Sequence, residues 1–170
     1  TVIIPAAIQP SFPPMPFLLF DPAELFSVLA FLIFGPVAAV ITATVHWIFL
    51  TATGTNVLGP AVKFAAVLST LFGLWFGSVL YRAMSKRANH ISLALGSMLG
   101  SAILARVGIL LVANYFVFTY IGPVIFGMDY LGFGQHTLQG TLGLRFTGPW
   151  DVLMAMLFYT SIFNGLHAIF

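Results

Sequence analysis

Long apolar segments alternate along the chain with short connections that contain proline, glycine or charged residues. A transmembrane helix needs about 20 predominantly apolar residues, and three of the segments reach this length. The others are shorter, so we expect the first to be the end of a truncated helix and the next two to tilt or to continue past their marks. The pattern predicts one domain, 1–170, with six transmembrane helices at approximately 1–9, 23–34, 37–50, 61–81, 91–120 and 150–170.

Three connections have sequences that disfavour a regular helix. Residues 10–16 contain four prolines, each of which lacks an N–H and fixes φ, so we expect a stiff, extended loop there. Residues 51–60 and 122–149 are rich in glycine and polar residues. We predict loops for both, the second with a short re-entrant or interfacial piece.

The carboxylates stand at predicted helix starts or in loops. Asp21 is suited to an N-cap, Pro22 to the first helical position, and Glu24 to the first turn, where the helix dipole favours an acid. Asp151 occupies the start of the last predicted helix, and Asp129 lies in a loop. Since an acid deep in the bundle is the usual mark of a proton-coupled carrier, this placement argues against that class.

Composition limits the class of protein. Hydrophobic residues make up 60% of the 170 residues and charged residues only 6%, whereas soluble domains carry about 25% charged residues. A soluble enzyme, a nucleic-acid-binding protein and a disordered chain are excluded, and a net charge of +2 gives no reason to expect a nucleic-acid partner. The chain contains no cysteine, which excludes disulfides and thiolate metal sites.

Half of the basic residues fall in one connection. Arg82, Lys86 and Arg87 lie between two predicted helices, and the positive-inside rule assigns that connection to the cytoplasm. Alternation then predicts a multi-pass protein of the cell membrane with both termini in the cytoplasm. The three irregular connections come to the outer face, which favours a site that opens outwards.

Catalytic signatures are absent from the sequence. It contains no H-E-x-x-H, no G-x-S-x-G and no phosphate-binding G-x-x-x-x-G-K-[ST] motif. The four histidines are spread without metal-ligand spacing. We therefore expect no enzymatic activity, no catalytic residue, no metal and no ATP hydrolysis by this chain.

Arg106 lies about 15 residues, or roughly 22 Å, into its predicted helix. A cation at that depth is costly and marks a functional site by default. The alternative is a structural arginine bound to backbone carbonyls or to a loop carboxylate. Asn114 lies eight residues on and about 80° around the helix, so the two side chains could border one cavity.

Two further polar residues lie deep in the last predicted helix. Asn164 and His167 are three residues apart and share a face of that helix. Lys63, on another helix, stands in the first turn of 61–81. Polar residues at such depth usually face the bundle interior. They could bind a ligand or form hydrogen bonds between helices.

Small residues recur at a four-residue spacing on two consecutive helices. Gly73 and Gly77 form one such pair, and Gly96 and Gly100 form the other. This spacing permits close approach of backbones. We expect the two helices to pack on each other, the alternative being the docking of a partner membrane protein.

Taken in order, several short motifs resemble one family. They are the proline-rich segment leading into residues 17–24 (FLLFDPAE), residues 35–38 (GPVA), Arg106 followed by residues 114–116 (NYF), and residues 163–164 (FN). This ordered set resembles the substrate-binding S component of energy-coupling factor (ECF) vitamin transporters of the riboflavin type.

The resemblance implies a six-helix membrane binder with no enzymatic activity and no cofactor. Such a subunit captures riboflavin from outside, while a separate transmembrane coupling protein and two cytoplasmic ATPase subunits supply the energy. The open alternatives are an S component for another vitamin or precursor, and a structural membrane subunit without transport function.

The resemblance also assigns roles to residues. Asn114, Asn164 and His167 would hold the flavin, although the family usually has lysine where this chain has His167. The first outer loop would cover the ligand, so we expect Phe17 and Leu18 to touch it. With the cations Arg106 and Lys63 added, the predicted substrate-binding set is Asn114, Asn164, His167, Arg106, Lys63, Phe17 and Leu18.

Overall fold

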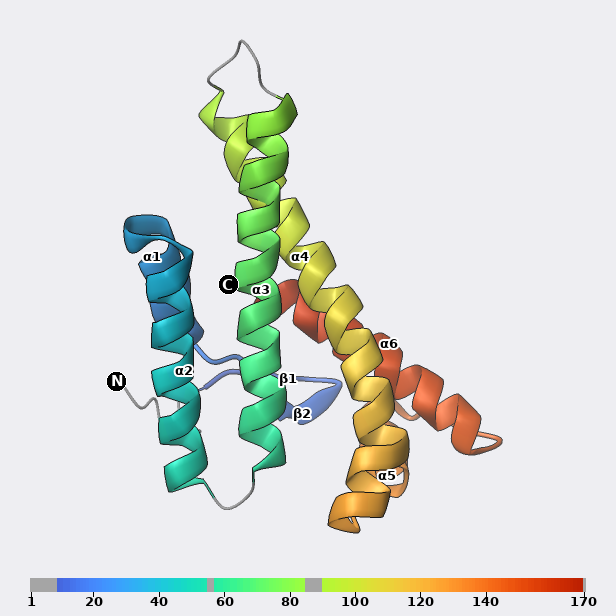
Figure 1. Ribbon diagram of the computed structural model, residues 1–170. Helices are drawn as coiled ribbons and strands as arrows, with labels where there is room; N and C mark the ends of the chain where they lie inside the picture. The colour runs from blue at the N-terminus through green and yellow to red at the C-terminus, as the bar shows by residue number, and fades with distance from the viewer. Residues whose placement is uncertain (1–8, 55–56, 85–89, 170) are drawn as a thin grey trace.

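The computed structural model describes residues 9–54, 57–84 and 90–169, so nearly all of the predicted first helix, 1–9, lies outside the described residues. The described chain is mainly helical, and it begins with a small hairpin (Figure 1). Its elements are β1 (Ser11–Phe12), β2 (Met15–Leu19), α1 (Glu24–Phe34), α2 (Pro36–Thr53), α3 (Leu58–Met84), α4 (Ile91–Phe116), the π-helix η2 (Val117–Ile125), α5 (Tyr130–Leu142) and α6 (Pro149–His167).

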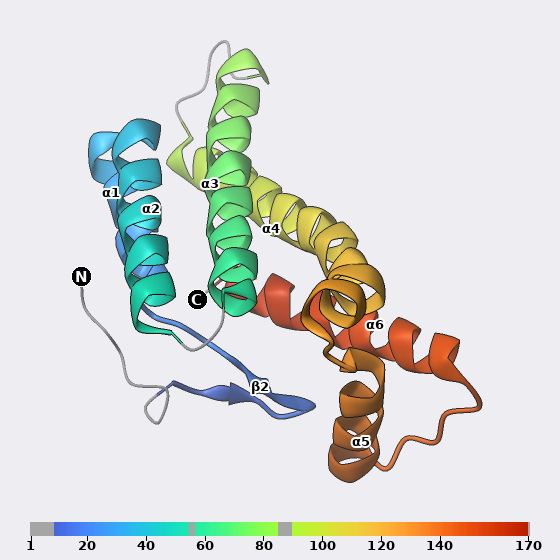
Figure 2. The same ribbon diagram turned by 60° about the horizontal axis from the view of Figure 1, so that its bottom comes forward.

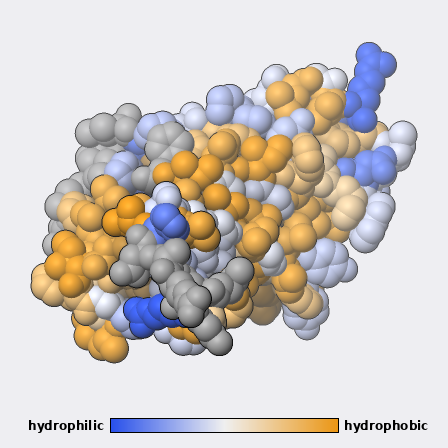
Figure 3. Space-filling view, turned by 90° about the horizontal axis from the view of Figure 1, so that it is seen from above, coloured by the Kyte–Doolittle hydropathy of each residue, from blue (hydrophilic) through white to orange (hydrophobic). Residues whose placement is uncertain are grey.

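Three helical stretches among the described residues are long and apolar enough to cross a membrane. They are Pro36–Thr53, Leu58–Ala83 and Ile91–Ile125. A view down the bundle shows hydrophobic side chains over most of the visible surface and hydrophilic ones in small separate areas (Figure 3). The chain is therefore a mainly α-helical protein with membrane-spanning helices.

The proline-rich segment, predicted as a stiff, extended loop, is extended, and its two halves pair as a hairpin. β1 and β2 pair antiparallel, with Ser11 opposite Leu19, and the Phe20 N–H donates to the Pro10 carbonyl at 2.9 Å. Prolines fit this two-stranded sheet because both strands are edges, where a missing N–H costs no ladder bond. Pro13 and Pro14 occupy the turn itself.

The break after α1 is where the sequence predicts it. Gly35 adopts φ 91°, a left-handed conformation that favours glycine, and its N–H donates to the Phe31 carbonyl at 2.9 Å. Pro36 then starts α2 at the first helical position. The chain reverses here, and α1 and α2 lie side by side (Figures 1 and 2).

The predicted close packing of α3 on α4 is present, but only one of the two glycine pairs lies at the contact. A Cβ at Gly73 or Gly77 would overlap the α4 backbone near Ala102 or Ser97, so both glycines are required by the approach of the two helices. The Ser97 hydroxyl donates to the Gly77 carbonyl at 2.9 Å. The second pair, Gly96 and Gly100, has open space where a Cβ would lie and takes no part in this contact.

Residues 122–149 contain much more helix than the predicted loop. α4 continues as η2 to Ile125, with Pro123 inside the π-helix, and the 13-residue α5 follows. Asp129 caps α5 by accepting from the Gly132 N–H at 2.8 Å. One of the glycines that suggested a loop, Gly134, is needed for packing because it leaves room for the Met156 side chain.

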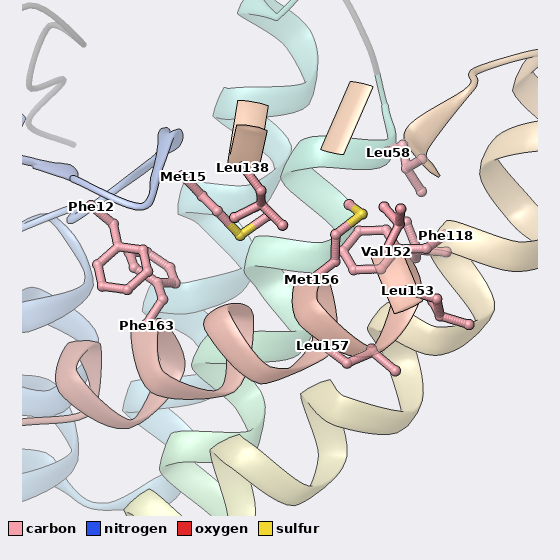
Figure 4. Close-up of a cluster of buried hydrophobic side chains, with 11 residues drawn as sticks. Phe12, Met15, Leu58, Phe118, Leu138, Val152, Leu153, Met156, Leu157 and Phe163 are labelled. Atoms are coloured by element: carbon pink, nitrogen blue, oxygen red, sulfur yellow. The ribbon is translucent and has the colours of Figure 1, made fainter. Parts of the chain in front are cut away.

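The main hydrophobic core joins the hairpin, α5 and α6. Phe12 and Met15 project from the hairpin, Leu138 from α5, and Met156 and Phe163 from α6 (Figure 4). Met15, Leu138 and Met156 are completely buried. The hairpin and α5 are thus fixed against α6, in the lower half of Figure 1 and away from the α3–α4 connection.

Candidate functional site

All seven residues of the predicted binding set line one cavity of about 350 Å³. Lys63 comes from α3, Arg106 and Asn114 from α4, and Asn164 and His167 from α6. Phe17 and Leu18 come from β2. Residues separated by as many as 150 positions in the sequence therefore meet around a single space.

Arg106 is buried and paired with Glu24. The exposed fraction of Arg106 is 2%, and its Nη1 donates to Glu24 Oε2 at 2.7 Å and to Thr70 Oγ1 at 3.2 Å. Arg106 was expected either to mark a functional site or to bind backbone carbonyls or a carboxylate. It binds a carboxylate, and it does so at the wall of the cavity. The first-turn role predicted for Glu24 is incomplete, because this acid lies in the bundle interior with a cationic partner.

Asp21 forms a second ion pair, with Lys63. It is not the N-cap of α1, which begins at Glu24 after Ala23; instead, Asp21 Oδ1 accepts from the Ala23 N–H at 2.8 Å. His46 Nε2 lies 4.0 Å from Asp21 Oδ2. Burial opposes ionisation of Asp21, but the hydrogen bond and charge of Lys63 outweigh it and hold the pKa of this carboxyl below its usual value. Asp21 is therefore an anion at neutral pH.

His167 is oriented by the backbone of the segment before α1. Its Nε2 accepts from the Asp21 N–H at 3.3 Å and lies 3.6 Å from Glu24 Oε1. The rings of Phe20 and Phe163 pack beside the imidazole. Since Nε2 is an acceptor, the proton of a neutral imidazole is on Nδ1, and Nδ1 is buried without a hydrogen-bond partner among the described residues.

Asn114 and Asn164 face the cavity from neighbouring helices. Both are buried, with exposed fractions of 7% and 5%. Neither carboxamide has a hydrogen-bond partner elsewhere in the described part of the chain, and both line the cavity. The alternative in which they tie helices together through side-chain bonds is thus not seen, and two amides remain for a ligand.

The hairpin and α5 meet beside the cavity. The rings of Phe17 in β2 and Phe133 in α5 lie 5.1 Å apart, and the Thr141 hydroxyl donates to the Pro14 carbonyl at 3.0 Å. Tyr130, the first residue of α5, lines the cavity. The cover of the site therefore includes α5, which the sequence did not predict as a helix.

The sequence interpretation missed several wall residues. Thr160 lines the cavity together with Asn164 and His167, and the spacing of four and three along α6 could have identified it. Glu24 was placed at a helix start without its partner. No sequence signal pointed to Tyr130, because its position depends on the path of η2 and α5.

A second cavity, of about 390 Å³, shares three residues with the first. Glu24, Arg106 and His167 line both spaces. The second is bordered mostly by apolar side chains of α1, α3 and α4, including Val28, Val67 and Ala102. The ion-paired cluster thus belongs to the walls of both cavities.

Comparison of the chain with protein-family models, with curated proteins and with solved structures finds no match. The geometry itself supports binding. It offers a partly open cavity with apolar and aromatic walls and a polar end of amides, an imidazole and ion pairs, which is the usual construction of a small-molecule site. Among the described residues, no three His, Asp or Glu side chains converge as metal ligands.

Proposed function

We propose that this chain is the substrate-binding S component of an ECF transporter and that it captures riboflavin from outside the cell. The observation that carries the proposal is the single cavity around which Asn114, Asn164, His167 and the aromatic ring of Phe17 in the hairpin meet. The sequence alone predicts these residues as members of one binding set. Their meeting around one space supports a shared ligand.

The chemistry of the walls suits a flavin. Its isoalloxazine is flat and largely apolar, and Phe17, Phe118, Tyr130 and Phe163 supply aromatic surface at the cavity. Its pyrimidine edge and ribityl chain carry donors and acceptors, which the amides of Asn114 and Asn164 can satisfy. A volume of about 350 Å³ lies within the range of small-molecule sites, about 300–1,000 Å³.

In this proposal the chain binds its ligand but does not itself use ATP. The sequence lacks a phosphate-binding loop, so a transmembrane coupling protein and two ATPase subunits would supply the energy. The chain would be a multi-pass protein of the cell membrane without enzymatic activity.

Equilibrium titration of the purified protein with riboflavin tests the proposal. Flavin fluorescence should be quenched saturably at one site per chain, and a chain purified from cells should carry flavin absorbance. The matched control is Asp151→Asn, which alters an exposed side chain of α6 outside the cavity and should bind as the native chain does. A colourless protein that does not bind added riboflavin would refute the proposal and favour another ligand or a structural role.

A further inference from the structure

The second cavity lies at the mid-span level of two membrane-crossing helices. Its wall includes Val67 and Leu74 of α3 and Ala102 of α4. Leu74 stands roughly 24 Å along α3 from its first residue and roughly 15 Å from its last. The hydrocarbon core of a bilayer is about 30 Å thick, so a level this far from both helix ends lies within it.

The second cavity opens sideways onto an apolar surface. Three of its wall residues are large apolar side chains with high exposure, namely Leu25 of α1 (46%), Leu99 of α4 (42%) and Ile169 after α6 (61%). Val67 and Leu74, which form the floor on α3, are buried. Since α1 and α4 stand on opposite sides of α3 (Figures 1 and 2), the opening lies between α1 and α4. At this level it faces lipid.

The polar side chains of this wall already bind one another. Arg106 donates to Glu24 and to Thr70, and His167 accepts from the N–H of Asp21. The described wall does not include the two carboxamides that line the first cavity. A polar ligand would lose its hydration here without gaining hydrogen bonds in proportion. Water also needs several polar partners in a buried site, so apolar walls favour neither.

The second cavity is elongated along the helices. Its residues on α3 run from Val67 to Leu74, roughly 10 Å along the axis. Pro22 borders the cavity beside Asp21, which pairs with Lys63 one turn before Val67. The long direction of the space therefore follows the helix axis, as the acyl chains of the surrounding bilayer do.

Hydrocarbon is the occupant that suits this space. Apolar walls without a neighbour forfeit dispersion contacts, and lipid acyl chains are the apolar groups present at the opening. We propose that the second cavity binds one acyl chain of a membrane phospholipid, which enters sideways between α1 and α4. This binding goes beyond the proposed function and does not depend on the ligand of the first cavity.

Photolabelling in a bilayer tests the proposal directly. The purified protein is placed in detergent-free phosphatidylcholine vesicles that contain a lipid with a photoreactive acyl chain, and mass spectrometry locates the label. We expect label on the buried Val67 and Leu74 as well as on Phe72 and Phe76, which are exposed on α3. Label on Phe72 and Phe76 alone would overturn the proposal and would mean that another apolar segment or partner covers the cavity.

A space-filling variant tests the location. Val28 lines the second cavity from α1, so Val28→Trp places a larger apolar side chain in the space. The label on Val67 and Leu74 should then be lost, while the label on Phe72 and Phe76 stays unchanged. Unchanged label on Val67 and Leu74 in a folded Val28→Trp protein would overturn the proposal, because the acyl chain would not lie in this cavity.

Two further variants guard against a folding defect. Ile33→Trp adds the same side chain at an exposed position of α1 outside the cavity, and its labelling should match that of the native protein. Val28→Phe fills less of the space and should still reduce the label on the floor if Val28→Trp does not fold. The measurement needs no flavin, so failure of riboflavin to bind would refute the proposed function and leave the acyl-chain site standing.

Discussion

Asn114 and Asn164 place two unbonded carboxamides at a buried cavity. Removing one neutral hydrogen-bond partner of a ligand costs about 1–3 kcal/mol, or roughly 5- to 150-fold in affinity. Asn114→Ala and Asn164→Ala should each weaken riboflavin binding to this extent without unfolding the protein. Titration of each variant, with thermal unfolding as the folding control, checks this. Near-native affinity in both would mean that the amides do not touch the ligand.

His167 should act as a neutral donor. Its Nε2 accepts the Asp21 N–H, and its Nδ1 is buried without a hydrogen-bond partner among the described residues. Acidification that protonates Nε2 breaks this arrangement, so native binding should weaken as the pH falls from about 8 to 5. Glutamine supplies one acceptor and donors without titrating, so His167→Gln should bind at near-native strength and lose that pH dependence.

The contrary result for His167 is equally clear. Titrations across the same pH range on His167→Gln and His167→Lys separate the two roles. If His167→Gln fails to bind and His167→Lys binds well, the site needs a cation there and a neutral donor is the wrong assignment.

At the residue scale, depth in the helix was the informative signal. Arg106, Asn114, Asn164 and His167 were identified because polar groups within apolar segments are costly, and all four line the cavity. Partners could not be predicted in the same way. Glu24 lies 82 positions from Arg106, and only the folded path of the chain brings such residues together.

At the element scale, Gly73 offers a test of the α3–α4 contact. A Cβ there would overlap the backbone at Ala102, whereas Gly100 has open space. Gly73→Ala should lower the free energy of unfolding by about 1–3 kcal/mol through overpacking. Gly100→Ala should be neutral or stabilising, because alanine favours the helix. Thermal unfolding in one detergent compares them, and equal stabilities would contradict the packing described.

The hairpin is the second element with a testable role. Phe17 and Leu18 line the cavity, and Phe17 also packs on Phe133 of α5. If the hairpin covers the bound ligand, Phe17→Ala with Leu18→Ala should mainly speed ligand release, because most losses of affinity appear in the dissociation rate. Stopped-flow displacement of riboflavin measures this. An unchanged dissociation rate would count against a covering role.

Local signals decided which elements were predictable. The sequence correctly predicted two long apolar helices, α3 and α4, and the break at Gly35–Pro36, since each of these features depends on neighbouring residues. The hairpin and α5 were not predicted. The prolines of the hairpin suggested an unpaired loop, but the pairing of its two edge strands arises only in the folded chain. The glycines of α5 also suggested a loop, but the contact of Gly134 with Met156 likewise arises only on folding.

At the scale of the whole molecule, ligand binding and energy supply belong to different proteins in the proposed function. Without partner proteins, the chain should bind riboflavin but should not concentrate it, because its sequence lacks a phosphate-binding loop. Vesicles that contain only the purified chain should show no ATP-driven accumulation, and uptake should require the coupling protein and the ATPase subunits. Concentrative, ATP-dependent uptake by the chain alone would contradict this.

The central claim is that riboflavin occupies the cavity between the hairpin, α4 and α6. An experimental structure of the protein saturated with riboflavin measures this most directly. The account predicts one flavin per chain, in contact with Asn114, Asn164 and His167 and beneath Phe17. An empty cavity in the saturated protein, or a flavin bound elsewhere on the chain, would contradict it.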